Sequence, residues 1–292
     1  MENIRKILTP AVGAELERLG ADGWRGLEEV RLRRGRRGQL VFADRTCELS
    51  CRIGEAELEY TLQMASRASV HRVLPQLRQG FVSLPGGHRL GICGTVGIRD
   101  GEIHSIDPIF GLNIRVAAAV PGIGRRVIAE LCPGENFLST FILAPPGAGK
   151  TTLLRDVIRC LSDGIGCRPH RVGLVDERGE VAALWRGEPQ LDVGANTDIM
   201  AECPKAQGLV MLLRGMNPQV LAADEITAAE DIRAMELVSG CGVQLLCTAH
   251  GADRRDLECR PLYRELMGAG MFRRLLTIRL EDGKRRYEVE EL

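Results

Sequence analysis

The stretch Phe141-Ile-Leu-Ala-Pro-Pro-Gly-Ala-Gly-Lys-Thr-Thr152 passes from an apolar segment into a tight turn that ends in a lysine and two threonines. Gly147 and Gly149 let the backbone curl until successive N–H groups point to the inside of the turn. Lys150 can then reach the terminal phosphates of a nucleotide, and Thr151 offers a hydroxyl group to Mg²⁺. The stretch therefore predicts a phosphate-binding loop.

The residues on either side of this loop support the same prediction. Phe137–Leu143 is the apolar run of a buried strand. Apolar residues then recur at helical spacing, at Leu154, Val157, Ile158 and Leu161. Bound phosphates would lie at the N-terminus of that helix, where free N–H groups and the helix dipole favour anions. The common pattern G-x-x-x-x-G-K-[ST] begins with glycine, whereas this chain has Ala144 there, the mildest replacement.

The composition is that of a globular protein without a net charge. The 292 residues are 45% hydrophobic and 27% charged, and 39 basic residues balance 39 acidic ones. No overall field therefore draws the chain to nucleic acid or to an anionic membrane. No apolar run reaches the roughly 18 residues of a membrane span, and the first residues lack the apolar segment of a secretory signal. We expect a cytoplasmic protein without direct membrane insertion.

The cysteines are expected to be reduced. Ten of them are scattered through the chain, many in apolar segments, and they form no repeated C-x-x-C pairs. Cys47 and Cys51 stand four positions apart, but no second pair and no nearby histidine completes a zinc site. Buried thiols are the favoured interpretation.

Two regions with different patterns divide the chain. Residues 1–120 hold short strands and tight turns with helical stretches between them, which predicts a small α+β domain. Residues 121–136 hold a short helix between two Pro-Gly pairs and are interpreted as a linker. In residues 137–292, apolar strands alternate with helices, the pattern of a parallel sheet with crossover helices. The predicted fold class is therefore α/β, with the phosphate loop in the second domain.

Several elements have readable boundaries. In the first domain, His88–Cys93 and Thr95–Arg99 are predicted as separate strands, and Asp100-Gly101 as a hairpin turn. The strands of the second domain are Phe137–Leu143, Arg171–Val175, Gln219–Ala223 and Val243–Thr248. Thr227-Ala-Ala-Glu230 predicts a capping box for a helix that ends before Gly240. A hairpin of Leu275–Leu280 and Arg286–Val289, joined by the turn Glu281-Asp-Gly283, completes the domain.

Polar residues follow the strands of the second domain where those strands end. Ligands of open parallel sheets bind beyond the carboxyl ends of the strands, so these residues are the candidates for a site. The strand Val220–Ala223 leads directly into Asp224 and Glu225. In a nucleotide site, Asp224 would hold Mg²⁺ through water beside Thr151, and Glu225 would polarise the attacking water.

Two further strands end in residues that suit the same chemistry. The strand at 171–175 ends in Asp176-Glu-Arg-Gly-Glu180, which makes Glu177 a second candidate base, although acidic loops are also common after strands. The strand at 243–248 leaves through Thr248-Ala-His-Gly251. His250 can donate a hydrogen bond to a γ-phosphate and so report its presence, although a single histidine there is also compatible with a structural role.

The order of these motifs resembles a known family. A-P-P-G-A-G-K-T-T at 144–152 is followed by V-D-E-R-G-E, by the helix Pro204–Arg214 leading to N-P-Q-V-L-A-A-D-E-I, and by T-A-H-G, an order similar to that of the secretion-type ATPases. R-Q-G-F-V-S-L-P-G-G-H-R-L-G-I-C-G at 78–94 and L-N-I-R-V-A at 112–117 extend the likeness to the front of the chain. Nearly the whole chain therefore resembles the stage III sporulation protein AA family.

The resemblance implies roles for numbered positions. ATP phosphates would be bound by Pro146, Gly147, Ala148, Gly149, Lys150, Thr151 and Thr152. Mg²⁺ would be held by Thr151 and Asp224. The base would be Glu225, Glu177 or both, since Asp176 and Glu177 match the acidic box of these ATPases. His250 matches a histidine box that often has two histidines. Arg115 lies where such enzymes present arginines to the nucleotide, sometimes from a neighbouring subunit.

The resemblance also implies a fold, an assembly and a setting. The fold would be a RecA-like P-loop ATPase core with a parallel-rich sheet and flanking helices, preceded by the smaller α+β domain, and the subunits would form a hexameric ring. Phosphoryl transfer gains from an arginine aimed at the developing charge, which is a physical motive for assembly. The ring would couple ATP hydrolysis to a membrane protein of a secretion-like channel complex in sporulation. It would lie in the mother cell, attached to the membrane through partner proteins.

Three other functions use the same loop. A nucleic-acid motor would account for Arg31-Leu-Arg-Arg-Gly-Arg-Arg37, but the chain is only 4% aromatic and has no aromatic residues interleaved with this run, so the nucleic-acid signal is not strong. Val30 and Leu32 alternating with arginines also suit a half-exposed strand. A small-molecule kinase would need an acceptor pocket and a lid, for which Ala182–Thr197 is long enough. A nucleotide-gated scaffold would not need the positioned carboxylates.

Overall fold

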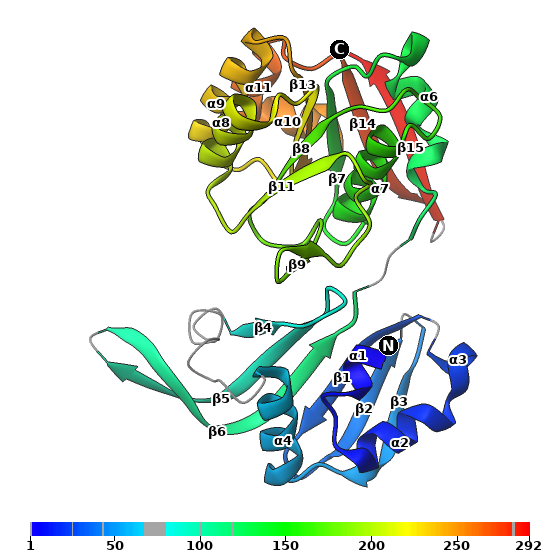
Figure 1. Ribbon diagram of the computed structural model, residues 1–292, viewed down its shortest axis with the longest axis vertical. Helices are drawn as coiled ribbons and strands as arrows, with labels where there is room; N and C mark the ends of the chain where they lie inside the picture. Colours follow the sequence, from blue (N-terminus) through cyan, green and yellow to red (C-terminus); the bar gives the residue numbers. More distant parts are fainter. Residues whose placement is uncertain are drawn as a thin grey trace. The chain divides into compact units, whose positions relative to one another are not determined.

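The chain forms two units, Met1–Ala118 and Ala119–Leu292, in a computed structural model (Figure 1). The structure describes residues 2–24, 26–42, 44–66, 80–99, 101–117, 120–281 and 284–292. Residues 100, 282 and 283 lie outside these ranges. They belong to the turns expected at Asp100-Gly101 and Glu281-Asp-Gly283.

An antiparallel sheet forms the centre of the first unit. Among its described residues, six strands pair in the order β3-β2-β1-β6-β5-β4 (Figure 1). The strands are β1 (Leu27–Arg33), β2 (Arg37–Phe42), β3 (Thr46–Arg52), β4 (Phe81–Ser83), β5 (Arg89–Arg99) and β6 (Glu102–Arg115). Val30 and Leu32 are buried, while Arg31 and Arg33 are partly exposed, as the alternation in the sequence predicts.

Helices cover the apolar face of this sheet. The described residues of this unit form α1 (Glu2–Arg5), α2 (Pro10–Arg18), α3 (Gly20–Gly23) and α4 (Glu55–Ser66), and residues of α1, α2 and α4 belong to the buried apolar cluster. Leu16 of α2 and Leu58 of α4 pack in one buried cluster with Leu32 and Leu40 of the sheet. Burial of these side chains is the main favourable contribution to the folding of this unit.

The strands at His88–Cys93 and Thr95–Arg99, predicted as separate, are one strand, β5. It pairs with β6 along its whole length, and irregularities in the register near Gly94 absorb the extra residues of β6. Gly94 makes this pairing possible, because a Cβ atom there would lie 2.5 Å from the carbonyl oxygen of Pro108. The prediction of a break was wrong because glycine in this strand allows close backbone approach instead of a turn.

A mostly parallel sheet forms the centre of the second unit. In its described residues, seven strands are ordered β11-β8-β12-β13-β7-β14-β15, and only β15 runs antiparallel to its neighbour. The strands are β7 (Thr140–Ala144), β8 (Val172–Asp176), β11 (Thr197–Ala201), β12 (Val220–Ala223), β13 (Gln244–His250), β14 (Arg274–Glu281) and β15 (Lys284–Glu291). Two-residue strands, β9 (Leu184–Trp185) and β10 (Glu188–Pro189), form a separate ribbon.

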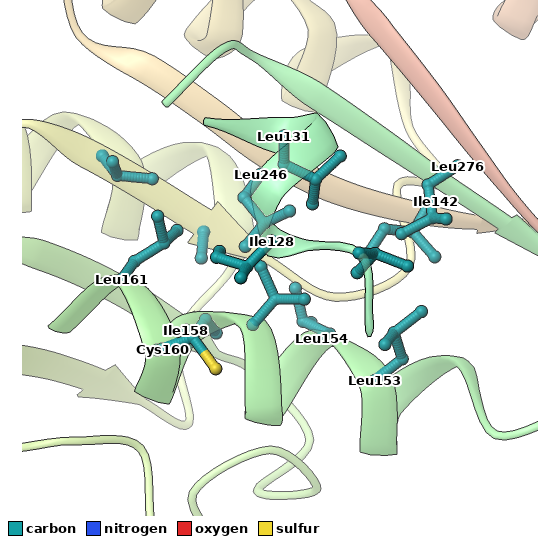
Figure 2. Close-up of a cluster of buried hydrophobic side chains, with 14 of the residues drawn as sticks. Ile128, Leu131, Ile142, Leu153, Leu154, Ile158, Cys160, Leu161, Leu246 and Leu276 are labelled. Atoms are coloured by element: carbon teal, nitrogen blue, oxygen red, sulfur yellow. The ribbon is translucent and has the colours of Figure 1, made fainter. Parts of the chain in front are cut away.

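Helices lie on both faces of this sheet. They are α6 (Ile128–Leu131), α7 (Lys150–Asp163), α8 (Lys205–Met216), α9 (Ala229–Gly240), α10 (Arg254–Cys259) and α11 (Pro261–Gly268). Ile142 of β7 packs toward α6 and α7 in one buried cluster (Figure 2), whereas Phe141 and Leu143 pack with residues of α8 to α11 in another. The central strands are continuous apolar runs because both faces are covered.

Residues 121–136, expected to be a linker, lie in the second unit and contain the short helices η1 (Gly124–Arg126), α6 and η2 (Pro133–Glu135). The buried carboxylate of Asp156 on α7 accepts the N–H groups of Gly122 at 2.9 Å and Gly124 at 2.6 Å. A Cβ atom at Gly124 would lie 2.9 Å from the backbone of Asp156. This segment is therefore docked closely onto α7.

The helix α9 begins one residue later than predicted. Asp231, and not Glu230, accepts the N–H groups of Thr227 at 3.3 Å and Ala228 at 3.2 Å. Because Ala228 is the N-cap, the third helical position falls on Asp231, while Glu230 is exposed to solvent. Gly240 is the last helical residue, and the left-handed glycine that follows the helix is Gly242, with φ of 80°.

Candidate functional site

The predicted phosphate loop joins the end of β7 to the start of α7. Gly147 and Gly149 have left-handed φ values of 74° and 96°, a conformation that is strained for any residue with a side chain. The N–H group of Ala148 donates to the carbonyl of Pro145 at 3.2 Å and closes the turn. Ala144 is the last residue of β7 and fully buried, so its methyl group packs in the core and the position does not need glycine.

Lys150 carries a charge that the protein itself leaves without a hydrogen bond. Its side chain is 6% exposed, and Nζ has no hydrogen-bond partner among the described residues. Nζ lies 4.0 Å from Oδ1 of Asp224. Burial lowers the pKa of Lys150, while the negative charges of Asp224 and Glu225 act in the opposite direction. A buried cation without a hydrogen bond is costly, so its presence indicates a site prepared for an anion.

Asp224 lies where β12 ends, and hydroxyl groups from two other elements donate to it. Thr151 Oγ1 donates to Oδ2 at 2.7 Å, and Thr248 Oγ1 of β13 donates to Oδ1 at 2.5 Å. The structure therefore brings together Thr151 and Asp224, the two residues predicted to hold Mg²⁺. Carboxylate and hydroxyl oxygens are ligands that Mg²⁺ accepts, so this pair is chemically suited to the ion. Sequence reasoning assigned no role to Thr248, although it stands in the quoted T-A-H-G motif.

Glu225 has a strained backbone and a carboxylate that faces two basic groups. Its φ is 51°, and its N–H group donates to Thr248 Oγ1 at 2.8 Å. Oε2 accepts a hydrogen bond from Arg178 Nη1 at 2.7 Å, and Oε1 lies 3.5 Å from Nε2 of His250. Glu225 and His250, predicted from two different strands, thus lie together because β12 and β13 are neighbours. Non-glycine residues with left-handed φ are uncommon and often occur at functional sites.

The acidic segment after β8 contains two carboxylates in different environments. The buried carboxylate of Asp176 accepts four backbone N–H groups, from Glu180, Val181, Ala182 and Ala183. Asp176 therefore holds the shape of the loop. Glu177 forms a salt bridge with Lys205, a buried lysine at the start of α8. A lysine is unfavourable at a helix N-terminus, and an acidic partner offsets that cost.

Two arginines that sequence reasoning did not single out reach the loops around the site. Arg155 of α7 donates to the carbonyl groups of Val181 at 2.5 Å and Glu180 at 2.7 Å. Burial lowers the pKa of Arg155, while Asp176 and Asp224 act in the opposite direction. Arg285 of β15 donates from Nε to the carbonyl of Ala148 at 2.7 Å. These contacts join elements that are far apart in the chain, and no local sequence pattern predicts them.

Arg115, predicted to act on the nucleotide, lies in the first unit. It is the last residue of β6, its side chain is 69% exposed, and its Nε is 4.0 Å from Oε1 of Glu29. In the same unit, arginines of the basic run have local partners. Arg31 contacts Glu29 at 2.5 Å, Arg33 donates to Gln39 at 2.7 Å, and Arg34 contacts Glu55 at 2.8 Å. The two ion pairs, to Glu29 and Glu55, reduce the charge that the run offers to another molecule.

The remaining sequence expectations concern cysteines and membranes. All ten cysteines are free thiols. In the part of the chain that the structure describes, no group of three or more histidine, cysteine, aspartate or glutamate side chains could hold a metal ion by itself. No helix within the described ranges is long and apolar enough to span a bilayer.

Comparison with known proteins finds matches over nearly the full length of the chain. The model of a protein family described as "Sporulation stage III, protein AA" matches residues 1–289. The stage III sporulation protein AA of Bacillus subtilis (strain 168) is 34% identical over 284 residues, which are 97% of this chain and 92% of that protein.

Solved structures share the fold. The pilus retraction motor PilT with bound ADP has a TM-score of 0.64 and 14% identity, over 91% of this chain and 79% of that chain. The Legionella pneumophila ATPase DotB has a TM-score of 0.57 and 16% identity, over 90% and 76% of the two chains. The predicted fold class, an α/β P-loop ATPase core with a parallel-rich sheet, is confirmed.

Proposed function

Because the chain belongs to the sporulation stage III protein AA family, we propose that it is the ATP-hydrolysing motor of a secretion-like channel complex in sporulation. The observation that carries the ATPase proposal is Lys150. Its buried Nζ has no hydrogen-bond partner among the described residues and lies beside the Thr151 and Asp224 pair. An anion with a bound cation would satisfy all three groups at once.

The loop residues have the properties that nucleotide binding requires. We propose that the phosphates are held by Pro146, Gly147, Ala148, Gly149, Lys150, Thr151 and Thr152. Thr151 and Asp224 would hold Mg²⁺, which neutralises negative charge on the phosphates. The N-terminus of α7 adds free N–H groups to the positive charge of Lys150.

Glu225 is the stronger candidate for the base. Both carboxylates have a cationic partner, but that of Glu177 is the buried Lys205, whereas that of Glu225 is Arg178, whose side chain is largely exposed. Glu225 directly follows Asp224, is 21% exposed and approaches His250 at 3.5 Å. We propose that Glu225 takes the proton of the attacking water and that His250 reports the terminal phosphate. Glu177 would then support the loop that faces the site.

The assembly proposed is a hexameric ring attached to a membrane protein. Residues 1–120 would act as an amino-terminal domain that presents Arg115 to a nucleotide, in the same subunit or a neighbouring one. Residues 137–292 would act as the ATPase domain, with 121–136 between them. The ring would work in the cytoplasm of the mother cell at the membrane surface, held there by its partner protein. The family supports the sporulation setting of this proposal.

ATP hydrolysis by the purified full chain, measured against protein concentration with light scattering for mass, tests this proposal. We expect a rate that rises with assembly and that falls at least about a hundredfold in Lys150→Ala and Glu225→Gln, because each removes a group that acts in the transition state. Glu236→Gln, which changes an exposed carboxylate on α9, serves as the matched control.

Three outcomes would contradict parts of the proposal. A stable monomer with a rate independent of concentration excludes the ring. Turnover that requires a small-molecule acceptor indicates a kinase. ATP binding without turnover in the presence of Mg²⁺ indicates a nucleotide-gated scaffold.

A further inference from the structure

A salt bridge connects the loop after β8 to the candidate base. Arg178 Nη1 lies 2.7 Å from Oε2 of Glu225, and the two side chains are 58% and 21% exposed. Arg178, the more exposed of the two side chains, therefore occupies one oxygen of the carboxylate. The proposed function gives Glu225 a task for which its carboxylate must be available, and this salt bridge opposes that task.

The backbone that carries Arg178 is firmly held. Asp176, two positions earlier, accepts N–H groups from residues 180 to 183 on its two carboxylate oxygens. Arg155 of α7 binds the carbonyl groups of Glu180 and Val181 in the same loop. Movement of Arg178 is therefore a movement of its long side chain and does not require the loop to rearrange.

The backbone of Glu225 is held as well. Thr248 accepts the N–H group of Glu225 at 2.8 Å and donates to Asp224 at 2.5 Å. The left-handed φ of 51° at Glu225 persists because these contacts fix it. Both ends of the salt bridge thus stand on backbone that is held by hydrogen bonds, so a change in this contact is a movement of the two side chains.

A terminal phosphate would compete for Arg178. Arg178 pairs with Glu225 at 2.7 Å, and Nζ of Lys150 lies 4.0 Å from Oδ1 of Asp224, the residue directly before Glu225, so both cations border the same pair of carboxylates. The negative charge of a phosphate bound at Lys150 would attract the guanidinium group of Arg178. Guanidinium groups bind phosphate oxygens through strong, charge-assisted hydrogen bonds, as they bind carboxylates.

We propose that Arg178 is a positioning residue that distinguishes nucleoside triphosphate from diphosphate. Without a terminal phosphate it pairs with Glu225 and holds the base occupied. With a terminal phosphate present it exchanges its carboxylate partner for phosphate oxygens and releases Glu225 toward the attacking water. This inference rests on the proposed ATPase function, and it adds a switch within one subunit that suppresses the base when only ADP is bound.

The test is a double-mutant cycle in nucleotide binding, measured by calorimetry on the full chain with Mg²⁺. ADP and a non-hydrolysable ATP analogue are titrated into wild type, Arg178→Ala, Glu225→Gln and the double variant. We expect Arg178→Ala to weaken the binding of the analogue by about threefold and the binding of ADP by less than twofold. In the Glu225→Gln background the same substitution should weaken the binding of the analogue by about tenfold or more, because Arg178 then has no salt bridge to break before it binds the phosphate.

Controls separate this switch from a structural role. Arg233→Ala, on the exposed side of α9, is expected to change neither affinity. Arg178→Lys keeps the charge and is expected to retain part of the preference for the triphosphate. Thermal unfolding of each variant shows whether the fold is intact.

The outcomes are distinct. If Arg178→Ala weakens the binding of ADP and of the ATP analogue equally, Arg178 does not distinguish the two nucleotides. If it weakens binding of the analogue by the same factor with Glu225 and with Gln at position 225, Arg178 does not exchange Glu225 for the phosphate. If wild type binds both nucleotides and hydrolyses ATP while Arg178→Ala matches Arg233→Ala, only this inference fails. If wild type binds neither nucleotide, the proposed function fails and the inference with it.

Discussion

Single residues in this chain retain unfavourable states where a ligand would bind. Lys150 is buried with no hydrogen bond to its ammonium group among the described residues, and Glu225 keeps a left-handed backbone. Such features lower stability and persist where a function needs them. Lys205 provides a contrast, because its buried ammonium group is paired with Glu177. We therefore expect the two lysines, which are similarly buried, to have opposite effects on stability.

This contrast predicts the result of replacing each lysine by methionine. We expect Lys150→Met to raise the free energy of unfolding of the nucleotide-free protein by about 1 kcal/mol, since a buried charge without a hydrogen bond is removed. It should also abolish the stabilisation that ATP with Mg²⁺ would give to wild type if the proposed site binds them. Lys205→Met, the matched control, should lower stability because Glu177 loses its partner. Thermal and urea unfolding, with and without nucleotide, measure both effects, and a destabilised Lys150→Met would contradict the argument.

His88 predicts a pH dependence in the first unit. It is buried, its Nδ1 accepts the N–H group of Ala117 at 3.0 Å, and burial lowers its pKa from 6.5 to about 4. As pH falls from 6.5 toward 4, the unfolded chain binds a proton that the folded chain does not. Stability is therefore full above pH 6.5 and falls by about 2 to 3 kcal/mol across this window.

Urea unfolding between pH 7.5 and pH 4 measures this loss. His88→Asn keeps an acceptor for Ala117 without a titrating ring, so its stability should depend less on pH in the same window. His104→Asn changes an exposed histidine of β6 and should retain the wild-type slope. Identical slopes in all three proteins would exclude His88 as the source.

Elements show how the chain protects its sheet edges. The strand β3 lies at the edge of the first sheet, where unpaired N–H groups would face solvent. Glu15 of α2 accepts the N–H groups of Ser50 at 2.6 Å and Cys51 at 2.9 Å, together with the hydroxyl group of Ser50 at 2.7 Å. One carboxylate thus accepts two N–H groups at the edge of the sheet. The strand that carries them, β3, was not predicted from the sequence.

The pKa of Glu15 turns this contact into a prediction. Burial alone would raise its pKa, but the hydrogen bonds from Ser50 and Cys51 outweigh it and lower the pKa from 4.5 to about 2. The contact stabilises the fold above pH 4.5, and this contribution is lost as pH falls from 4.5 to 2. Glu15→Gln should therefore be less stable than wild type at pH 7, and the difference should shrink below pH 4.5.

Urea unfolding at several pH values between 7 and 3 checks this expectation. Glu48→Gln, which changes an exposed carboxylate on β3 itself, is the control and should match wild type. A difference between Glu15→Gln and wild type that stays constant with pH would refute the role of the carboxylate charge.

At the scale of the whole molecule, the candidate site residues are divided between the two units. The predicted phosphate-binding loop, the carboxylates and His250 belong to the second unit, whereas Arg115 belongs to the first. If Arg115 completes the site of a neighbouring subunit, catalysis depends on assembly. That dependence can be tested without knowing how the subunits are arranged.

Mixing two inactive variants is the test. We expect Arg115→Ala and Lys150→Ala to be inactive alone and to regain up to about a quarter of wild-type activity when mixed equally, because random mixed rings then contain interfaces with both groups intact. Co-purification of differently tagged variants shows that mixing has occurred. Mixed assemblies without any recovery would mean that Arg115 does not act on a neighbouring subunit.

The sequence by itself was enough for features that depend on residues close in the chain. The turn at 141–152 was readable because the glycines with left-handed φ, the lysine and the apolar strand before them are contiguous. The parallel sheet followed from strands alternating with helices, and the polar residues after each strand had to meet because parallel strands end at the same edge. The capping of α9 and the continuity of β5 were mispredicted, since one shifted residue or one close backbone approach leaves no distinct local pattern.

Only the tertiary structure decided which side chains are partners. Arg178 with Glu225, Lys205 with Glu177, and Arg285 with the carbonyl of Ala148 join positions 47, 28 and 137 residues apart. Nothing in a local pattern distinguishes these residues from other charged residues on loops and strand edges. Their pairing depends on strand order and on which face of each element is buried, and these are settled when the apolar residues of the whole unit pack together.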